Sequence, residues 1–147
     1  MCFTKLTARD LRAIWSDAKW KREERKTMTA SSLCFKAGIL LLLVGMLWGI
    51  HMGISQNHSA MPAHAHLNLL GFVVLFLFGI FYRLHPKAEA NPWAFRQVLI
   101  WIVSTVVLVI GVGLVHTGHA TAEPIAAIGS LAIFADTALF TWLVFRA

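Results

Sequence analysis

The sequence of 147 residues contains little charge, since Asp, Glu, Lys and Arg together make up only 14% of it. Hydrophobic residues make up 58%, and the mean hydropathy is +0.68. A soluble domain of this size exposes too much surface to water to carry that balance. The composition therefore excludes a soluble enzyme, a disordered chain and a nucleic-acid-binding module, and it favours a protein that is solvated by lipid.

Cysteine is also scarce. Cys2 lies in a basic segment and Cys34 lies at the start of the first apolar run. Both positions are expected on the reducing side of a membrane, so we expect no disulfide and exclude a disulfide scaffold. The first 30 residues are too polar to hold the apolar core of a cleavable signal peptide, and we expect none.

Four apolar runs dominate the rest of the chain, at residues 33–55, 61–84, 93–115 and 124–145. A helix of ~20 residues, rising ~1.5 Å per residue, crosses a hydrocarbon core of ~30 Å. Backbone groups in lipid must bond within their own segment, and short connections make neighbouring helices antiparallel. We therefore predict an all-α fold, an integral membrane four-helix bundle formed by residues 33–147.

The placement of Lys and Arg predicts the orientation. Nine of the 13 lie in the first 36 positions, and Arg83, Lys87, Arg96 and Arg146 follow in the second connection and the tail. The first and third connections contain none. By the positive-inside rule, both termini are cytoplasmic, and the basic head lies beside an anionic leaflet rather than on nucleic acid. We expect a multi-pass protein of the bacterial inner (cytoplasmic) membrane.

Residues 1–32 have a pattern of their own. Thr7 and Asp10 fit a variant of the helix capping box, and apolar residues then recur at helical spacing with charges between them. We predict a cytoplasmic amphipathic helix that lies on the membrane surface. The alternative is a solvated helix packed on the second connection.

The sequence contains seven histidines. The predicted topology places six at the outer end of the bundle: His51, His58, His64, His66, His116 and His119. It leaves His85 on the cytoplasmic side. Ionisable residues at membrane depth are costly and suggest function, so a metal or haem site is the leading hypothesis. We interpret His58 and His85 as interfacial residues.

Spacing separates the remaining candidates. His64 and His66 stand ~160° apart on one helix, so they point to different sides and suit two sites, or two protomers that share sites. His116 and His119, three residues apart, would stand about 60° apart and could reach one metal. An all-nitrogen donor set suits haem iron, copper or zinc. Ligation is favoured for the first pair, whereas for His51, His116 and His119 an interfacial role remains equally open.

Asn68, Asp136 and an aromatic run are further candidates for function. Asn68, one turn after His64, could hold an imidazole or a haem propionate. Asp136 lies near the middle of the fourth run, where a charge is expensive. Membership of a proton path and a hydrogen-bonded packing role are both open for it, and packing is favoured. The aromatic run 72–82 is also interpreted as packing rather than as the lining of a haem pocket.

The stretch Ala63–Gly71 (AHAHLNLLG), continuing to Gly79–Arg83, resembles the haem-copper oxidase subunit I superfamily over roughly 20 residues. It looks most like the tenth helix of that subunit, and the resemblance implies that His64 ligates a high-spin haem and His66 a low-spin haem. The same stretch is similar to the second helix, which would make His64 a low-spin haem ligand. His116 and His119 occupy a place similar to the copper ligands, at a different spacing. The single tyrosine, Tyr82, does not form the family's His–Tyr pair.

That subunit has twelve helices in three groups of four, and this chain supplies four. The resemblance therefore implies a homo-oligomer, with a trimer favoured, that holds b-type haem and serves electron transfer or binding of oxygen or nitric oxide. A redox partner protein is implied as well, and oxidoreductase turnover is left open. The alternatives are a copper- or zinc-handling membrane protein that uses His51, His116 and His119, and a non-catalytic subunit of a respiratory complex.

Overall fold

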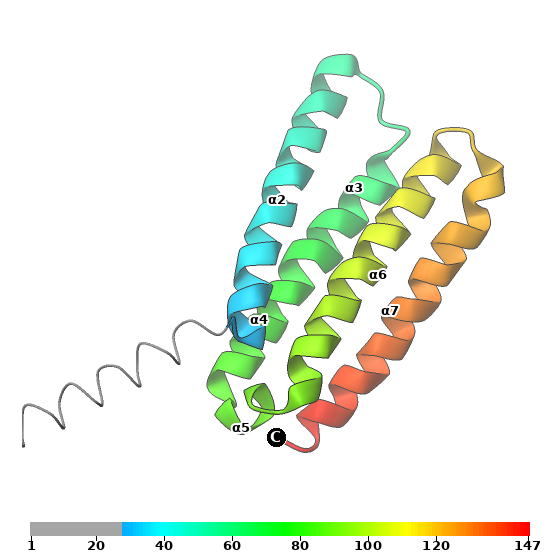
Figure 1. The fold of residues 1–147 in the computed structure, drawn as a ribbon. Helices are drawn as coiled ribbons and strands as arrows, with labels where there is room; N and C mark the ends of the chain where they lie inside the picture. The colour runs from blue at the N-terminus through cyan, green and yellow to red at the C-terminus, as the bar shows by residue number, and fades with distance from the viewer. Residues whose placement is uncertain (1–27) are drawn as a thin grey trace, which may run out of the picture.

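The computed structural model describes residues 28–147, which form helices and no strand. Four helical spans in this part are long and apolar enough to cross a membrane: Ala30–Ser55, Met61–Leu84, Pro92–His116 and Ala120–Val144. They run antiparallel along the chain (Figure 1). The predicted all-α fold is confirmed, and so are four helices that are long and apolar enough to span a membrane, with ends close to those expected. Residues 1–27 of the predicted amphipathic segment lie outside the described residues.

The first span is one helix, α2 (Ala30–Ser55). The Thr29 side chain caps its start by accepting a hydrogen bond from the backbone N–H of Ser32. An N-cap of this kind satisfies one of the N–H groups that a helix leaves unpaired at its beginning. The helix ends at Gln56, which adopts a left-handed conformation with φ 53°.

The second span changes its helical form midway. It consists of α3 (Met61–Asn68), the π-helical segment η1 (Leu69–Val74) and α4 (Leu75–Leu84). The indole nitrogen of Trp101 donates a hydrogen bond of 3.0 Å to the carbonyl of Leu70, inside the π-helical segment. The hydropathy of the sequence does not predict this change of helical form, because residues 69–74 are as apolar as the rest of the span. Short π-helical segments occur frequently at functional sites.

The second half of the chain contains α5 (Pro86–Glu89), α6 (Pro92–His116), the 3-10 turn η2 (Ala120–Ala122) and α7 (Glu123–Val144). Asn91 caps α6 by accepting a hydrogen bond from the backbone N–H of Trp93. Pro92 follows the cap at a position where its missing N–H costs nothing.

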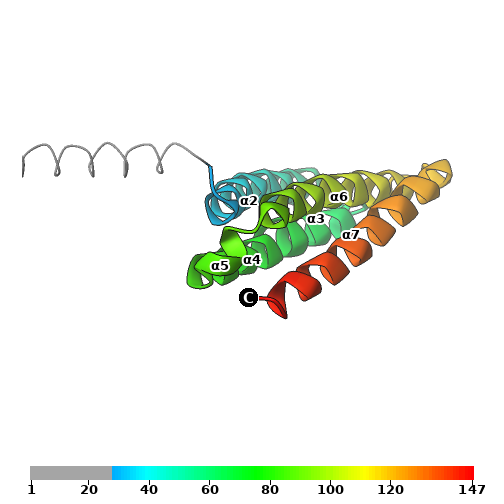
Figure 2. The same cartoon turned by 60° about the horizontal axis from the view of Figure 1, so that its bottom comes forward.

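The helices pack in sequence order: α2 on the second span, the second span on α6, and α6 on α7. Helices α2 and α7 lie at opposite edges of the molecule (Figures 1 and 2). Only 17% of the apolar window of each is buried, against 39% for α6. The two edge helices therefore present most of their surface to the surroundings of the chain.

Helices α6 and α7 approach so closely that their backbones touch. A Cβ added at Gly129 would lie 2.6 Å from the Cα of Leu108, and one at Gly111 would lie 2.7 Å from the Cα of Ala126. Small residues at such crossings allow the close packing that holds helices together in lipid.

The main core lies at the end of the bundle where α2 begins and α7 ends. We call this the basic end, because it carries Arg83, Lys87, Arg96 and Arg146. Phe78 stacks on Phe140 with ring centroids 4.0 Å apart and meets Trp101 edge-on at 4.7 Å. Phe78 and Tyr82 of the aromatic run thus pack as core, with Phe81 against them. The opposite end has a smaller core, built on Ala63, Leu67 and Val109.

Candidate functional site

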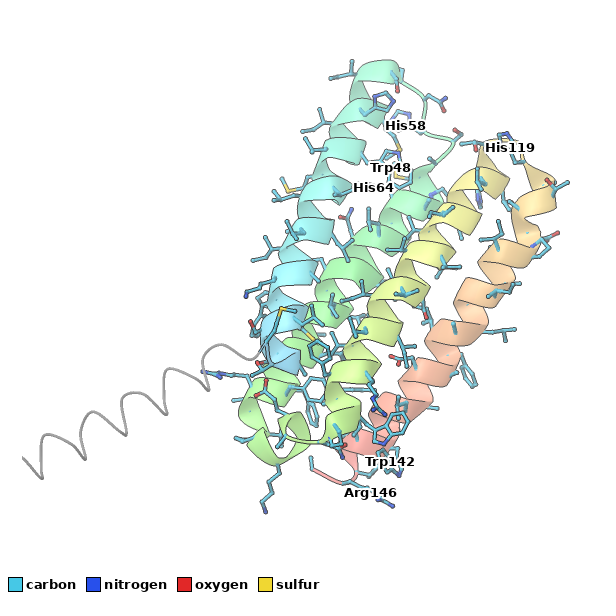
Figure 3. The ribbon with its side chains drawn as sticks, viewed as in Figure 1. Trp48, His58, His64, His119, Trp142 and Arg146 are labelled. Atoms are coloured by element: carbon cyan, nitrogen blue, oxygen red, sulfur yellow. The ribbon has the colours of Figure 1, made fainter. Side chains whose placement is uncertain are left out.

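The candidate site lies at the end of the bundle opposite the basic end, which we call the histidine end. It holds the connection between α2 and α3 and that between α6 and α7. His58, His64 and His119 all lie there (Figure 3). Of the seven histidines, His64 and His66 are half-buried, whereas the other five are exposed. Burial therefore distinguishes His64 and His66, the pair that the sequence favoured as ligands, from the other five histidines.

His64 is paired with Asn68, one helical turn further along. The side-chain nitrogen of Asn68 lies 3.0 Å from Nε2 and 3.5 Å from Nδ1 of the His64 ring. Because an amide nitrogen can only donate, His64 Nε2 accepts this hydrogen bond. The side-chain oxygen of Asn68 is buried and has no hydrogen-bond partner among the described residues. The prediction that Asn68 could hold an imidazole agrees with this contact.

Two glycines of α2 make room for this pair. A Cβ at Gly49 would lie 3.0 Å from Cε1 of His64, and a Cβ at Gly45 would collide with the side-chain oxygen of Asn68. The four residues, Gly45, Gly49, His64 and Asn68, form what we call the glycine cradle. A larger side chain at Gly45 or Gly49 would force the polar ends of Asn68 and His64 to shift.

His66 stands on a different side of α3, as its spacing from His64 predicts. Its Nδ1 lies 2.7 Å from the carbonyl oxygen of Pro62, so Nδ1 carries the proton and Nε2 keeps its lone pair. A carbonyl that fixes the tautomer in this way is the usual support of a metal-binding imidazole. His85 and His116 make the same bond at 2.9 Å, so the half-burial of His66 is what distinguishes it.

His116 and His119, the candidates for a shared metal site, do not lie on one helix. His116 is the last residue of α6, and His119 lies beyond it, after Gly118 with φ 100°. The expectation that both share a helix face about 60° apart is therefore wrong, because the helix has ended. Within residues 28–147, no three or more His, Cys, Asp or Glu side chains group closely enough to hold a metal ion. A copper or zinc site built from these residues stays a prediction.

His51 lines a groove of about 270 Å³ at the histidine end. The groove reaches from the end of α2 to the end of α6, and its other lining residues are Trp48, Met52, Ser55, Asn57, Ser59, Ala60 and Thr117. Hydroxyl and amide side chains from the connection make it partly polar. His51 is exposed and takes part in none of the contacts of the glycine cradle.

A second polar cluster lies in the basic half of the bundle. The hydroxyl of Tyr82 donates a 2.9 Å hydrogen bond to Oε1 of Gln97, and Nε2 of Gln97 donates one of 2.6 Å to Oδ2 of Asp136. All three side chains are buried, and they join α4, α6 and α7. These two linked hydrogen bonds favour the interpretation of Asp136 as a packing residue. Gln97 was not singled out from the sequence, although an amide inside an apolar run is itself unusual.

Glu89 connects the second connection to the start of α2. Its carboxylate accepts hydrogen bonds from the backbone N–H of Ser31 at 3.0 Å and from the Ser31 hydroxyl at 2.5 Å. Partial burial favours the neutral acid, but these hydrogen bonds outweigh it and hold the pKa of Glu89 below its usual value. The ionised carboxylate thus acts as a second cap on α2.

No protein-family model, curated protein or solved structure matches the chain. The resemblance of residues 63–83 to the oxidase subunit therefore depends on the sequence motif alone.

Proposed function

We propose that the chain is a membrane-bound b-type haem protein that uses His64 and His66 as iron ligands near the outer face of the membrane. The observation that carries this proposal is that these two, among seven histidines, are the half-buried ones. They also immediately precede the π-helical segment of the second span. Bound haem would supply an iron centre whose potential and reactivity depend on its axial ligands and on its burial.

The residues around His64 fit such a group. The glycine cradle leaves room for the His64 ring beside α2, and a buried oxygen of Asn68 has no partner among the described residues. His64 Nε2 accepts a hydrogen bond from Asn68, so coordination through that nitrogen requires the amide to move away. His66 needs no such change, because its hydrogen bond uses Nδ1.

Two imidazoles on different sides of one helix cannot easily hold the same iron within a single chain. We infer that a haem with two axial imidazoles would take His64 from one copy and His66 from its neighbour. A homotrimer, as the oxidase resemblance implies, repeats this contact around a closed ring. The largely exposed faces of α2 and α7 support this proposal, since they leave surface for neighbouring copies.

With two imidazoles the centre would suit electron transfer to or from a redox partner protein. With one imidazole, an open position could bind oxygen or nitric oxide. Both versions place the site at the outer side of a bacterial inner membrane, with both termini cytoplasmic, as the distribution of Lys and Arg predicts.

The first test is optical. Purified protein, expressed with adequate haem, should show a Soret band and split visible bands in a reduced-minus-oxidised spectrum. His64→Ala and His66→Ala should each lose most of this absorbance, because each removes one axial ligand. His58→Ala and His85→Ala are matched controls that remove an exposed histidine from each end, and both should retain the spectrum. Wild-type protein without haem absorbance would refute the proposal, as would full haem content in the first two variants.

The second test asks whether two copies share one haem. His64→Ala and His66→Ala chains, each of which should bind little haem when expressed alone, are coexpressed with different affinity tags. Oligomers that contain both variants are then purified through the two tags in turn. Every trimer that carries both tags holds two copies of one variant and one of the other, so one of its three interfaces keeps both histidines. Haem should therefore return to roughly one third of the wild-type content. No recovery in the mixed oligomers would contradict sharing between copies and leave ligation within one chain.

A further inference from the structure

A separate feature lies at the basic end, on the outside of the α6–α7 pair. Trp93 and Leu139, with Trp142, line an open apolar slot of about 280 Å³. Trp93 lies in the first turn of α6 and Trp142 in the last turn of α7, so antiparallel packing brings the two indoles to one level. Trp93 is 44% exposed and Trp142 is 38% exposed, so both rings are accessible from outside the helix pair.

Each indole carries a guanidinium on its face. The Cζ atom of Arg96 lies 5.1 Å from the ring centroid of Trp93, and that of Arg146 lies 4.5 Å from the ring centroid of Trp142. Figure 3 shows Trp142 and Arg146 together at the lower end of α7. Stacking occupies the flat face of a guanidinium and leaves its N–H groups, which lie in the plane, free to bind an anion.

The side-chain carboxylates of residues 28–147 lie elsewhere. Glu89 is bonded to Ser31, Asp136 is buried against Gln97, and Glu123 begins α7 at the histidine end. The slot thus combines an apolar floor with two cations that none of these acids is placed to neutralise. The positive-inside rule assigns this end to the cytoplasmic leaflet, which contains anionic lipids, and Trp is enriched at that depth.

We propose that the slot between Trp93 and Trp142 binds an anionic phospholipid of the cytoplasmic leaflet. The acyl chain lies in the apolar slot, and the phosphate is held by Arg96 and Arg146. A zwitterionic lipid would fill the same slot, but its own ammonium group would compete with the guanidinium groups for the phosphate. The site is independent of the haem proposal, because it shares no residue with the histidine end.

The test uses the full chain in phosphatidylcholine nanodiscs that contain increasing fractions of phosphatidylglycerol brominated on its acyl chain. Bromine quenches tryptophan fluorescence on contact, so brominated phosphatidylglycerol should quench at lower fractions than brominated phosphatidylcholine. A charge-assisted hydrogen bond from a guanidinium to the lipid phosphate contributes enough to change binding roughly tenfold. Arg96→Gln and Arg146→Gln should each raise the half-quenching fraction by about that factor.

Two controls make the result specific. Arg83→Gln/Lys87→Gln removes two positive charges from the same end but leaves the slot intact, so its half-quenching fraction should remain that of wild type. Trp93→Phe/Trp142→Phe should remove the quenching that is specific to phosphatidylglycerol, because these rings report on the slot. The proposal is overturned if the two brominated lipids quench equally, if the charge control shifts as far as the slot variants, or if the phenylalanine variant keeps the specific quenching.

Discussion

The close crossing of α6 and α7 makes a quantitative prediction at Gly129. In Gly129→Ala, the new Cβ would lie 2.6 Å from the Cα of Leu108, whereas ordinary contacts begin at 3.4 Å. To restore an ordinary contact the helices must separate by about 3.4 − 2.6 = 0.8 Å, because backbone atoms cannot rotate away. Overpacking of this kind costs ~1–3 kcal/mol, and the helix gains ~0.5–1 kcal/mol from replacing glycine by alanine. We expect a net loss of up to about 2.5 kcal/mol in the free energy of unfolding.

The matched control is Gly53→Ala, since a Cβ at Gly53 would meet nothing within 4 Å. It lies in α2 and should receive only the gain in helix stability. Both variants and the wild type can be unfolded by titration with SDS in mixed micelles, followed by circular dichroism and tryptophan fluorescence. The close approach of the two helices is refuted if Gly129→Ala proves as stable as Gly53→Ala.

Three further predictions concern buried or capping hydrogen bonds. Asp136→Leu should lower the free energy of unfolding by about 1–3 kcal/mol in the same titration, because it leaves the Gln97 amide without its acceptor, whereas Asp136→Asn should remain close to wild type. A larger loss for Asn than for Leu would contradict this reasoning. Trp101→Phe should cost about 0.5–1.5 kcal/mol by removing the donor to the Leu70 carbonyl, and no loss would show that this bond adds nothing. The pKa of Glu89 is lowered in the folded chain, so its contribution is present above the usual glutamate pKa and is lost as the pH falls through the lowered value. Glu89→Ala should therefore destabilise the protein at neutral pH by about the size of an N-cap, ~1 kcal/mol, and the difference from wild type in thermal melts should shrink in acid. A difference that stays constant with pH would contradict a role for the ionised carboxylate.

The four long apolar helices could be predicted from the sequence, because length and hydropathy are local properties. The apolar runs 61–84 and 93–115 matched the observed spans at Met61–Leu84 and Pro92–His116 closely. It also predicted that His64 and His66 point to different sides, since that follows from helical spacing alone. Spacing failed for His116 and His119 because the helix ends between them, and a pattern fixes helix ends less well than helix interiors.

The contacts between side chains of different helices could not be predicted in this way. Gly45 and Gly49 carry no indication in the sequence that they lie opposite Asn68 and His64, because the crossing of α2 and α3 depends on packing along their whole length. The partnership of Gln97 with a residue 39 positions away likewise depends on α6 and α7 touching. Local periodicity determines what each helix exposes, whereas contacts between distant segments depend on how whole surfaces fit together.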